Sequence, residues 1–386
     1  FDRANQLVYL TAWRNFTTGI KAEYVNGSVL LYGGLIPVAL SFEAFIPIQI
    51  SGVDYDWGGD GSDSNPFLIR TKDDLVAMKE NILTDYSNNE YFGGFYLLAN
   101  DLVFTPEDFR FDGAYYNGSK GFDPMIGTSS ANTPLPFCGG FDGGGHTISG
   151  LKQVIIAGSG ADAGLFAQTA THYDTVLDLY HYPSIHDLNL SDFVIAGDTQ
   201  ETDYAGFVVG RAGADTEFFN INVENSSLER TLLYSGGIVG QAADSNLQNC
   251  RVSGCLIKTN QESGYAGGIA GTFSGTIGDP AYMGSGYDVT VDSCEIVGGA
   301  RAGGILGYNL NKSVMITSSL VTGTTEVDAS GEESAGAGGI AGAFEGTGGN
   351  SIIEKSVVDE AVTVTSKNIS GGIVGRSGLD GTAFLT

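Results

Sequence analysis

Basic residues are scarce in this 386-residue sequence, which has 18 Lys and Arg against 45 Asp and Glu and a formal net charge of −27. A charge of this sign opposes binding to nucleic acids, anionic membranes and polyanionic substrates. The sequence contains no apolar run long enough to predict a membrane-spanning helix. It begins at Phe1 without the charged and apolar regions of a secretory signal, so a signal or anchor segment is expected outside this sequence.

Cysteine and histidine are also rare, at four residues each. The cysteines show no CxxC spacing and are too few for a disulfide scaffold. None of the histidines belongs to the HExxH pattern that holds zinc in peptidases, and no GxSxG nucleophile elbow is present. The motifs therefore give no support to proteolysis or to serine hydrolase chemistry, and no cofactor is indicated.

Glycine is abundant, at 58 of 386 residues, and much of it stands in one repeated word. The word "SGGIVG" (235–240) returns as "AGGIAG" (266–271 and 337–342), "AGGILG" (302–307) and "SGGIVG" (370–375), with looser copies at 163–168 and 205–210. A period in the thirties without helical apolar spacing indicates a stacked β array. The repeat glycines, taken as the second of each pair or its equivalent, are Gly164, Gly206, Gly237, Gly268, Gly304, Gly339 and Gly372.

A second six-residue pattern, called the second word below, follows each glycine word. Its side chains alternate between the inner and outer side, as they do along a β-strand. Its copies are predicted to begin at Ile185, Phe218, Leu247, Val291, Ile316 and Ile353. The fourth position of this alignment holds Cys250 and Cys294, which predicts that the two lie at one ladder position in neighbouring coils, either as buried thiols or as a disulfide.

A strand of this kind cannot bury its face alone, but stacked coils align like residues into ladders that form a core. The sequence therefore predicts an all-β fold: a parallel β-helix, expected to be right-handed, with about seven repeat coils. The glycine pair is interpreted as structural, supplying either positive φ or tight packing at a coil corner.

The pattern "GGIVG" followed by "LQNCRVSG" resembles the GLUG motif of bacterial surface proteins, including adhesin-like proteins of gut Bacteroidetes and the non-catalytic repeat region of immunoglobulin A proteases. The run "FDGGGHTISGL" (141–151) resembles the segment that precedes such repeats. The resemblance covers about residues 57–386 and implies a secreted or cell-surface protein, anchored to the outer membrane of a Gram-negative bacterium. It specifies no activity, because one scaffold serves many roles.

Three parts are predicted along the chain. Residues 1–52 read as strands separated by Asn-Gly and Gly-Gly turns, and form either a small β-domain or strands packed on the helix end. Residues 53–151 are the entry and cap, in which "TKDDLVAMKENI" (71–82) predicts a short amphipathic helix with Thr71 as N-cap and Asp74 in a capping box. Residues 152–386 form the repeat β-helix.

An acidic stretch, "DYDWGGDGSDSN" (54–65), offers an alternative metal site at Asp54, Asp56 and Asp60, but it lacks the spacing of a calcium loop. A Gly-rich turn is the preferred interpretation, and no metal is predicted. His146 in "GGGHTI" is interpreted as a corner residue rather than a catalytic one. A glycan-degrading enzyme would need a carboxylate pair across a cleft, which sequence alone does not identify.

Two loops rich in aromatic residues are the candidate ligand-binding sites: "FRFDGAYYNGSKGF" (109–122) and "THYDTVLDLYHYPS" (171–184). Aromatic rings with polar neighbours suit sugar rings or protein hot spots, although such rings also serve to cover a coil edge. We therefore expect a monomeric, non-enzymatic adhesin or stalk module that binds a host glycoprotein or glycan. Its alternatives are a repeat region of an immunoglobulin A protease-like protein and a glycan-degrading enzyme. The candidate residues are Tyr115, Tyr116, Tyr173, Tyr180, His181 and Tyr182.

Overall fold

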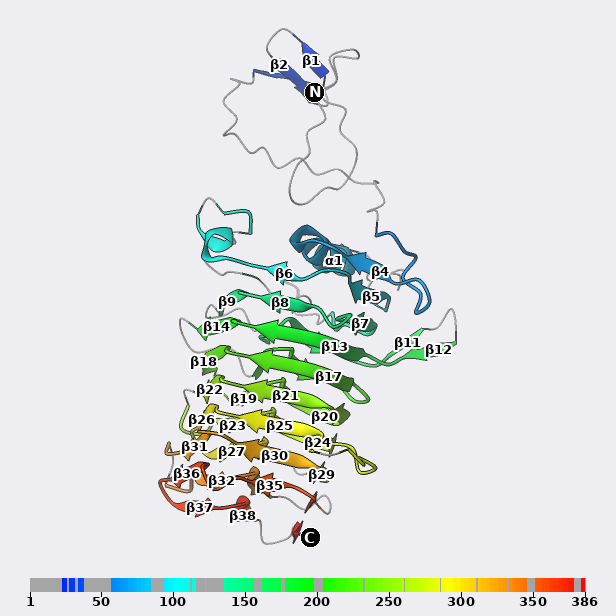
Figure 1. Cartoon of the computed structure of the whole chain (residues 1–386). Helices are drawn as coiled ribbons and strands as arrows, with labels where there is room; N and C mark the ends of the chain where they lie inside the picture. The colour runs from blue at the N-terminus through cyan, green and yellow to red at the C-terminus, as the bar shows by residue number, and fades with distance from the viewer. Residues whose placement is uncertain are drawn as a thin grey trace. The chain divides into compact units, whose positions relative to one another are not determined.

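Figure 1 shows the computed structural model of the chain. It describes residues 23–25, 28–31, 34–37, 57–84, 93–111, 113–115, 122, 135–155, 162–174, 178–197, 204–231, 233–259, 261–284, 286–309, 312–331, 333–345, 351–377 and 383–385. The chain divides into two compact units, Phe1–Trp57 and Gly58–Thr386.

The first unit contains a three-stranded antiparallel sheet. Val25 pairs with Ser28 on either side of the Asn-Gly sequence that predicted a turn there. Its strands are β1 (Glu23–Val25), β2 (Ser28–Leu31) and β3 (Gly34–Pro37).

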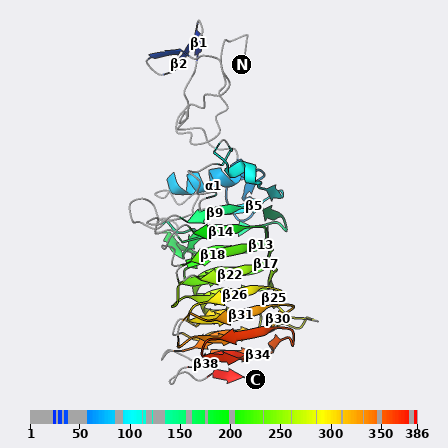
Figure 2. The ribbon, with the colours of Figure 1, turned by 90° about the vertical axis from the view of Figure 1, so that its left-hand side faces the viewer.

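The second unit is a parallel β-solenoid, which confirms the predicted fold class (Figures 1 and 2). One coil runs through β15 (Tyr204–Gly206), β16 (Val209–Ala212), β17 (Glu217–Glu224) and β18 (Ser227–Thr231). The next coil then begins with β19 (Tyr234–Gly236). Strands of one coil pair in parallel with their counterparts in the next, so every coil satisfies the backbone groups of its neighbour.

Two walls of the solenoid are built from short strands. Six strands form the wall that carries the glycine word: β15, β19, β23 (Tyr265–Gly267), β27 (Arg301–Gly303), β32 (Gly336–Gly338) and β37 (Ile369–Gly371). Seven strands form another wall: β9 (Lys152–Ile155), β14 (Val194–Gly197), β18, β22 (Leu256–Thr259), β26 (Glu295–Gly298), β31 (Glu326–Ala329) and β36 (Thr363–Ser366).

The remaining solenoid strands form one continuous 21-stranded sheet, which includes strands of the entry segment. Besides β16 and β17 they are β4 (Phe67–Ile69), β5 (Phe95–Leu98), β6 (Leu102–Val103), β7 (Gly140–Asp142), β8 (Thr147–Ser149), β10 (Phe166–Thr169), β13 (Ser184–Ser191), β20 (Val239–Gln248), β21 (Cys250–Ser253), β24 (Ala270–Ile277), β25 (Val289–Asp292), β28 (Leu306–Tyr308), β29 (Val314–Thr317), β30 (Ser319–Thr322), β33 (Ala341–Phe344), β34 (Ser351–Glu354), β35 (Val357–Val358), β38 (Val374–Ser377) and β39 (Ala383–Leu385).

The core is made of ladders of like residues. In each coil the second word starts with a buried apolar side chain, and these side chains lie in register from coil to coil. This ladder contains Ile185, Phe218, Leu247, Ile277, Ile316 and Ile353.

One rung of the predicted ladder was wrong. Val291 was expected at the first position, but Ile277 occupies it, and Val291 pairs with Val252 five positions later. The cause is an insertion, residues 278–288, which splits this copy of the word between β24 and β25. Consequently Cys250 lies beside Val289, and Cys250 and Cys294 do not share a ladder position.

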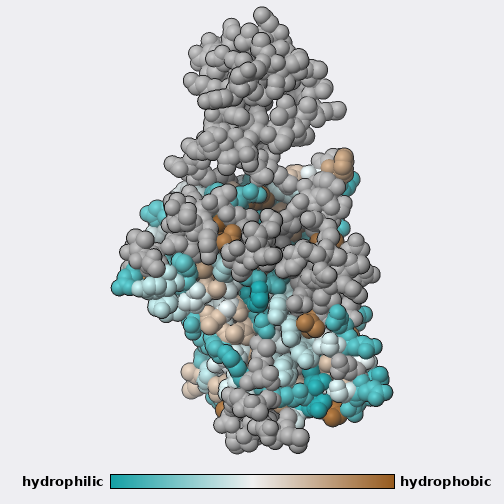
Figure 3. Space-filling model, turned by 180° about the vertical axis from the view of Figure 1, so that it is seen from behind, coloured by the Kyte–Doolittle hydropathy of each residue, from teal (hydrophilic) through white to brown (hydrophobic). Residues whose placement is uncertain are grey.

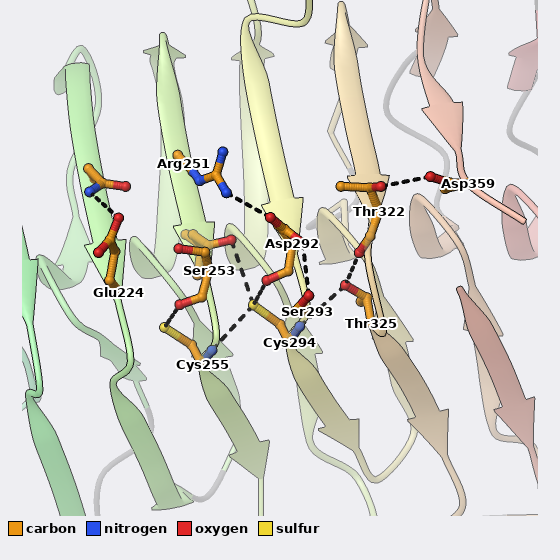
Figure 4. Close-up of polar contacts among 12 residues, drawn as sticks. Glu224, Arg251, Ser253, Cys255, Asp292, Ser293, Cys294, Thr322, Thr325 and Asp359 are labelled. Atoms are coloured by element: carbon orange, nitrogen blue, oxygen red, sulfur yellow. Dashed lines mark hydrogen bonds and ion pairs between the residues drawn. The ribbon is translucent and has the colours of Figure 1, made fainter. Parts of the chain in front are cut away.

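Cys294 instead lies in a different ladder, next to Cys255 (Figure 4). The backbone N–H of Ser226 donates to the Cys255 sulfur at 3.4 Å, that of Cys255 to the Cys294 sulfur at 3.5 Å, and that of Cys294 to Thr325 Oγ1 at 3.3 Å. The Cys294 thiol donates in turn to the Asp292 carbonyl at 3.3 Å. A short polar side chain thus joins each coil to the next at this corner.

All four cysteines are buried free thiols. Burial raises the pKa of Cys138 and Cys250 to about 12, so these two thiols stay protonated and unreactive at neutral pH.

The coil corners use residues that tolerate the left-handed region. Asp, Asn, Ser and glycine hold most of the described positions of positive φ, because a bulkier side chain is strained there, and Lys355 is the exception. The corner after the second word holds Asp192, Asn225, Gly254, Ser293 and Gly323, all with φ between 50° and 65°.

The glycine word works through close packing rather than through φ. Gly237, Gly268, Gly304 and Gly339 are absent from the residues with positive φ. A Cβ atom on each would lie 2.1 Å from a carbonyl oxygen of the next coil. Gly206 lies in register with Gly236, the first glycine of its pair, so the alignment of Gly206 with Gly237 was shifted by one residue.

The N-terminal end of the stack carries the predicted helix, α1 (Lys72–Thr84), the one α-helix in the described part of the chain (Figures 1 and 2). Its capping box is present: the Thr71 N–H donates to Asp74 Oδ2 at 2.8 Å, and the Asp74 N–H to Thr71 Oγ1 at 3.2 Å. Leu75, Met78 and Ile82 are fully buried, as a capping face requires. A 3₁₀ turn, η1 (Pro106–Phe109), follows. None of the described helices is long and apolar enough to span a membrane.

Candidate functional site

The predicted loop at 171–184 contains an antiparallel hairpin of β11 (His172–Asp174) and β12 (Leu179–His181), and is an insertion between β10 and β13. The hairpin projects sideways from the stack where it joins β13 (Figure 1). Its strands belong to none of the solenoid sheets. The insertion is therefore an appendage that the coils carry.

Aromatic side chains gather on this hairpin. Tyr173 lies opposite Tyr180 with ring centroids 4.8 Å apart, and Tyr182 lies 6.1 Å from Tyr180. Tyr173, Leu179, Tyr180 and Tyr182 are 42–54% exposed. On the rear face of the molecule, by contrast, the hydrophobic residues that Figure 3 colours brown are scattered singly among hydrophilic ones. The hairpin is thus a concentrated aromatic surface.

Two further features order the hairpin. The Tyr173 hydroxyl donates to Asp178, and this hydrogen bond raises the pKa of Tyr173. His181 lies opposite His172, with ring centroids 6.4 Å apart. Of the six candidate residues, the structure brings together Tyr173, Tyr180, His181 and Tyr182.

Tyr115 is placed elsewhere. It is 7% exposed, its ring packs against Phe104 at 5.5 Å, and its hydroxyl donates to Asp73 Oδ1 at 2.8 Å. The side chain holds α1 against the entry segment, so it offers little surface to a ligand. Tyr116 lies outside the described residues.

The acidic stretch behaves as a turn where it is described. Asp60 Oδ1 accepts hydrogen bonds from the N–H of Ser62 at 3.0 Å and from its hydroxyl at 2.7 Å, and these bonds lower the pKa of Asp60. Asp54 and Asp56 lie outside the described residues.

The structure also reveals a tyrosine ladder. Tyr204, Tyr234, Tyr265 and Tyr308 are half-buried and follow one another with ring centroids 5.1, 5.4 and 5.0 Å apart. The Arg211 guanidinium lies 5.1 Å from the Tyr204 ring. The sequence carried a signal for the first three, because each tyrosine stands directly before a glycine word.

Charged residues continue this edge of the solenoid. Arg301 lies in register with Tyr265, and its guanidinium contacts Glu345 Oε1 at 3.0 Å. Arg376 Nε contacts the same oxygen at 2.9 Å. The two arginines neutralise one carboxylate, so this end of the ladder is a structural ion cluster.

An open groove of about 650 Å³ lies on the outer face of β20, β24, β29 and β34. Its lining includes Asp244 and Lys312, which form an ion pair at 2.7 Å, and the side chains of Asn246, Thr276 and Met315. It holds no pair of carboxylates, and so lacks the arrangement that glycosidases use.

A histidine and two carboxylates meet where the end of β7 lies beside β13. His186 Nδ1 lies 2.8 Å from Asp187 Oδ2 and 3.6 Å from Asp142 Oδ1. Within the described residues, these three side chains are the group of His, Cys, Asp and Glu whose donor atoms converge as metal ligands would. Sequence reasoning missed the group because Asp142 and His186 meet only through strand register.

His146 takes the corner position expected for it. It follows Gly144 and Gly145, both with positive φ, and its Nδ1 lies 3.1 Å from Asp101 Oδ1. A single carboxylate accompanies it, in contrast to His186.

No protein-family model and no curated protein matches the chain. Among solved structures, the fold is similar to that of a Bacteroides ovatus protein titled a "putative immunoglobulin A1 protease". The two are 16% identical, the match covers 81% of this chain and 86% of the other, and the TM-score is 0.48. A likeness at this level carries no information on activity or ligand, and the resemblance to GLUG-motif proteins stays a prediction.

Proposed function

We propose that this chain is a non-enzymatic binding module of a bacterial surface protein, and that its β11–β12 hairpin binds a host glycoprotein or glycan. The observation that carries this proposal is the cluster of exposed aromatic side chains on the hairpin. Large apolar side chains gathered on a projecting element mark interaction sites in otherwise polar proteins.

The chemistry of the hairpin cluster favours a sugar, or a protein surface that accepts aromatic side chains, as its ligand. A tyrosine ring offers an apolar face to the C–H groups of a sugar, while its hydroxyl forms hydrogen bonds at the rim. The ring contacts from Tyr173 to Tyr180 and from Tyr180 to Tyr182 hold the side chains near one another before binding. Pre-ordering of this kind lowers the entropic cost of binding.

The charge of the chain restricts the partner. At a formal net charge of −27, long-range repulsion disfavours sulfated or otherwise polyanionic glycans. We therefore propose a neutral glycan, or a glycoprotein that presents one, as the target. A rod of stacked coils suits display away from a cell surface, in agreement with the surface location that the sequence predicts.

The test is binding of the labelled protein to an array of mucins, matrix proteins, immunoglobulins and neutral glycans. The double variant Tyr180→Ala, Tyr182→Ala removes the exposed rings and is expected to lower affinity by at least about tenfold, as loss of hot-spot aromatics does. Phe219→Ala is the matched control, because Phe219 is an aromatic residue that is 48% exposed and lies on β17, outside both candidate loops. Its affinity should equal that of the wild type.

Gels of the bound targets complete the test. Intact targets and a hairpin-dependent signal support the proposal. Cleaved targets would contradict it and would point to an enzyme, either a protease-like protein or a glycan-degrading one. Binding that survives the double variant, or no binding to any target, also contradicts it.

A further inference from the structure

Two adjacent coils bring Asp142, His186 and Asp187 together. Asp142 ends β7 and pairs in register with His186 on β13. Asp187 follows with φ of 53°, a left-handed conformation that turns its carboxylate toward the imidazole at the corner. The three side chains are 34–40% exposed, so solvent reaches the group.

Neighbouring residues orient both carboxylates. Asn220, from the next coil, donates its amide N–H to Asp187 Oδ1, which leaves Oδ2 beside His186. The Gly144 N–H donates to Asp142 Oδ1 at 2.7 Å. No Lys or Arg among the described residues forms an ion pair with Asp142 or Asp187. The negative charges of these two carboxylates are therefore available to bind a metal cation.

We infer that this group is a Zn²⁺ site. A tetrahedral ion with bonds of about 2.1 Å holds its donor atoms about 3.4 Å apart. The His186 nitrogen lies 2.8 and 3.6 Å from the two carboxylate oxygens, and the three donor atoms lie within 4.8 Å of one another. Shifts of roughly an ångström bring all three to bonding positions, and water completes the tetrahedron.

The set of donors selects the metal. Imidazole nitrogen suits Zn²⁺ and related transition metals, whereas Ca²⁺ and Mg²⁺ require six or more oxygen ligands that this corner does not supply. Asp142 belongs to the coil of β7 and β8, and His186 belongs to the next coil, which contains β13. The ion therefore joins two neighbouring coils. Zn²⁺ should therefore stabilise the N-terminal end of the solenoid, independently of any ligand at the hairpin.

The test uses the full chain in metal-free buffer, with Zn²⁺ titrated by calorimetry and stoichiometry measured by equilibrium dialysis. We expect one Zn²⁺ per chain, a rise in the unfolding temperature with Zn²⁺, and retention of Zn²⁺ in excess Mg²⁺ or Ca²⁺. His186→Gln and Asp142→Asn each remove a direct ligand of the ion. Loss of a residue that only hydrogen-bonds to a ligand weakens metal binding by up to about 100-fold, so we expect each variant to weaken Zn²⁺ binding by about 100-fold. Both should also abolish the rise in unfolding temperature.

Two histidine variants serve as controls. His146→Gln alters the corner histidine that has one carboxylate, and His181→Gln alters the cross-strand histidine pair of the hairpin. Both should bind Zn²⁺ as the wild type does. The proposal is overturned if Zn²⁺ does not bind, or if His181→Gln is the variant that loses Zn²⁺ binding. It is also overturned if binding is weak and unchanged in His186→Gln, which is the result expected of an adventitious ion only.

Discussion

At the scale of the residue, the second glycine of each word is fixed by the distance between coils. At Gly268 a Cβ would lie 2.1 Å from the Gly304 carbonyl oxygen and 2.8 Å from Val291 Cγ1. Hydrogen bonds hold parallel coils about 4.8 Å apart, so the backbone of the next coil cannot move away to make room for a Cβ atom. The repetition of the word therefore records a packing requirement that returns once in every coil.

Gly268→Ala should accordingly destabilise the protein by about 3 kcal/mol, the upper end of the usual cost of overpacking. Gly372→Ala is the control, because Gly372 occupies the same position of the word in the last coil and has nothing within 4 Å of its added Cβ. We expect that variant to lie within about 1 kcal/mol of the wild type, since its main effect is on the unfolded chain. Urea denaturation measures both. Equal losses in the two variants would contradict the packing account, because neither glycine has a positive φ.

At the scale of the element, the cap helix closes the end of the stack. An open solenoid end exposes core side chains and unpaired strands, which invite association with other chains. The buried side chains of Leu75, Met78 and Ile82 point to this role, as does the Lys72 Nζ contact of 2.7 Å with Asp108 Oδ2 in η1. The cap therefore contributes stability and protects against self-association.

Leu75→Ala removes one fully buried side chain from this face and should cost about 3 kcal/mol. Hydrogen exchange should report the loss first in β4 and α1, because the solenoid beyond them keeps its own contacts. Val76→Ala, at a half-buried position of the same helix, should cost less than about 1 kcal/mol. A loss of protection spread evenly over all coils would mean that α1 is not a local cap.

The elements that sequence predicted best are those with local signals. Thr71 and Asp74 specify the start of α1 from four consecutive positions, and the glycine words mark the coils directly. The second word failed at Val291 because its copy is interrupted by the insertion at 278–288, and hydrophobic pattern alone cannot detect a split strand. The Asp142–His186 contact could not be predicted, since it depends on which coil stacks on which.

At the scale of the whole molecule, the solenoid is a linear array in which each coil contacts its neighbours. Stability is then a sum of coil and interface terms, and no single coil is indispensable. Tyr234 pairs with Tyr265 and Ser235 with Ala266, so removal of residues 235–265 brings the chain into the next coil in register. The hairpin and the Asp142–His186 corner both lie outside the removed segment.

The chain without residues 235–265 should therefore fold to a shorter solenoid with a β-type circular dichroism spectrum. Its denaturant m-value should fall by roughly the share of one coil, because m scales with the surface exposed on unfolding. Removal of residues 235–250, about half a coil, is the control: it breaks the register of every later ladder and should yield aggregated or unfolded protein. If both deletions fold equally well, the coils are not in the strict register that the buried ladders describe, and the linear account of stability fails with them.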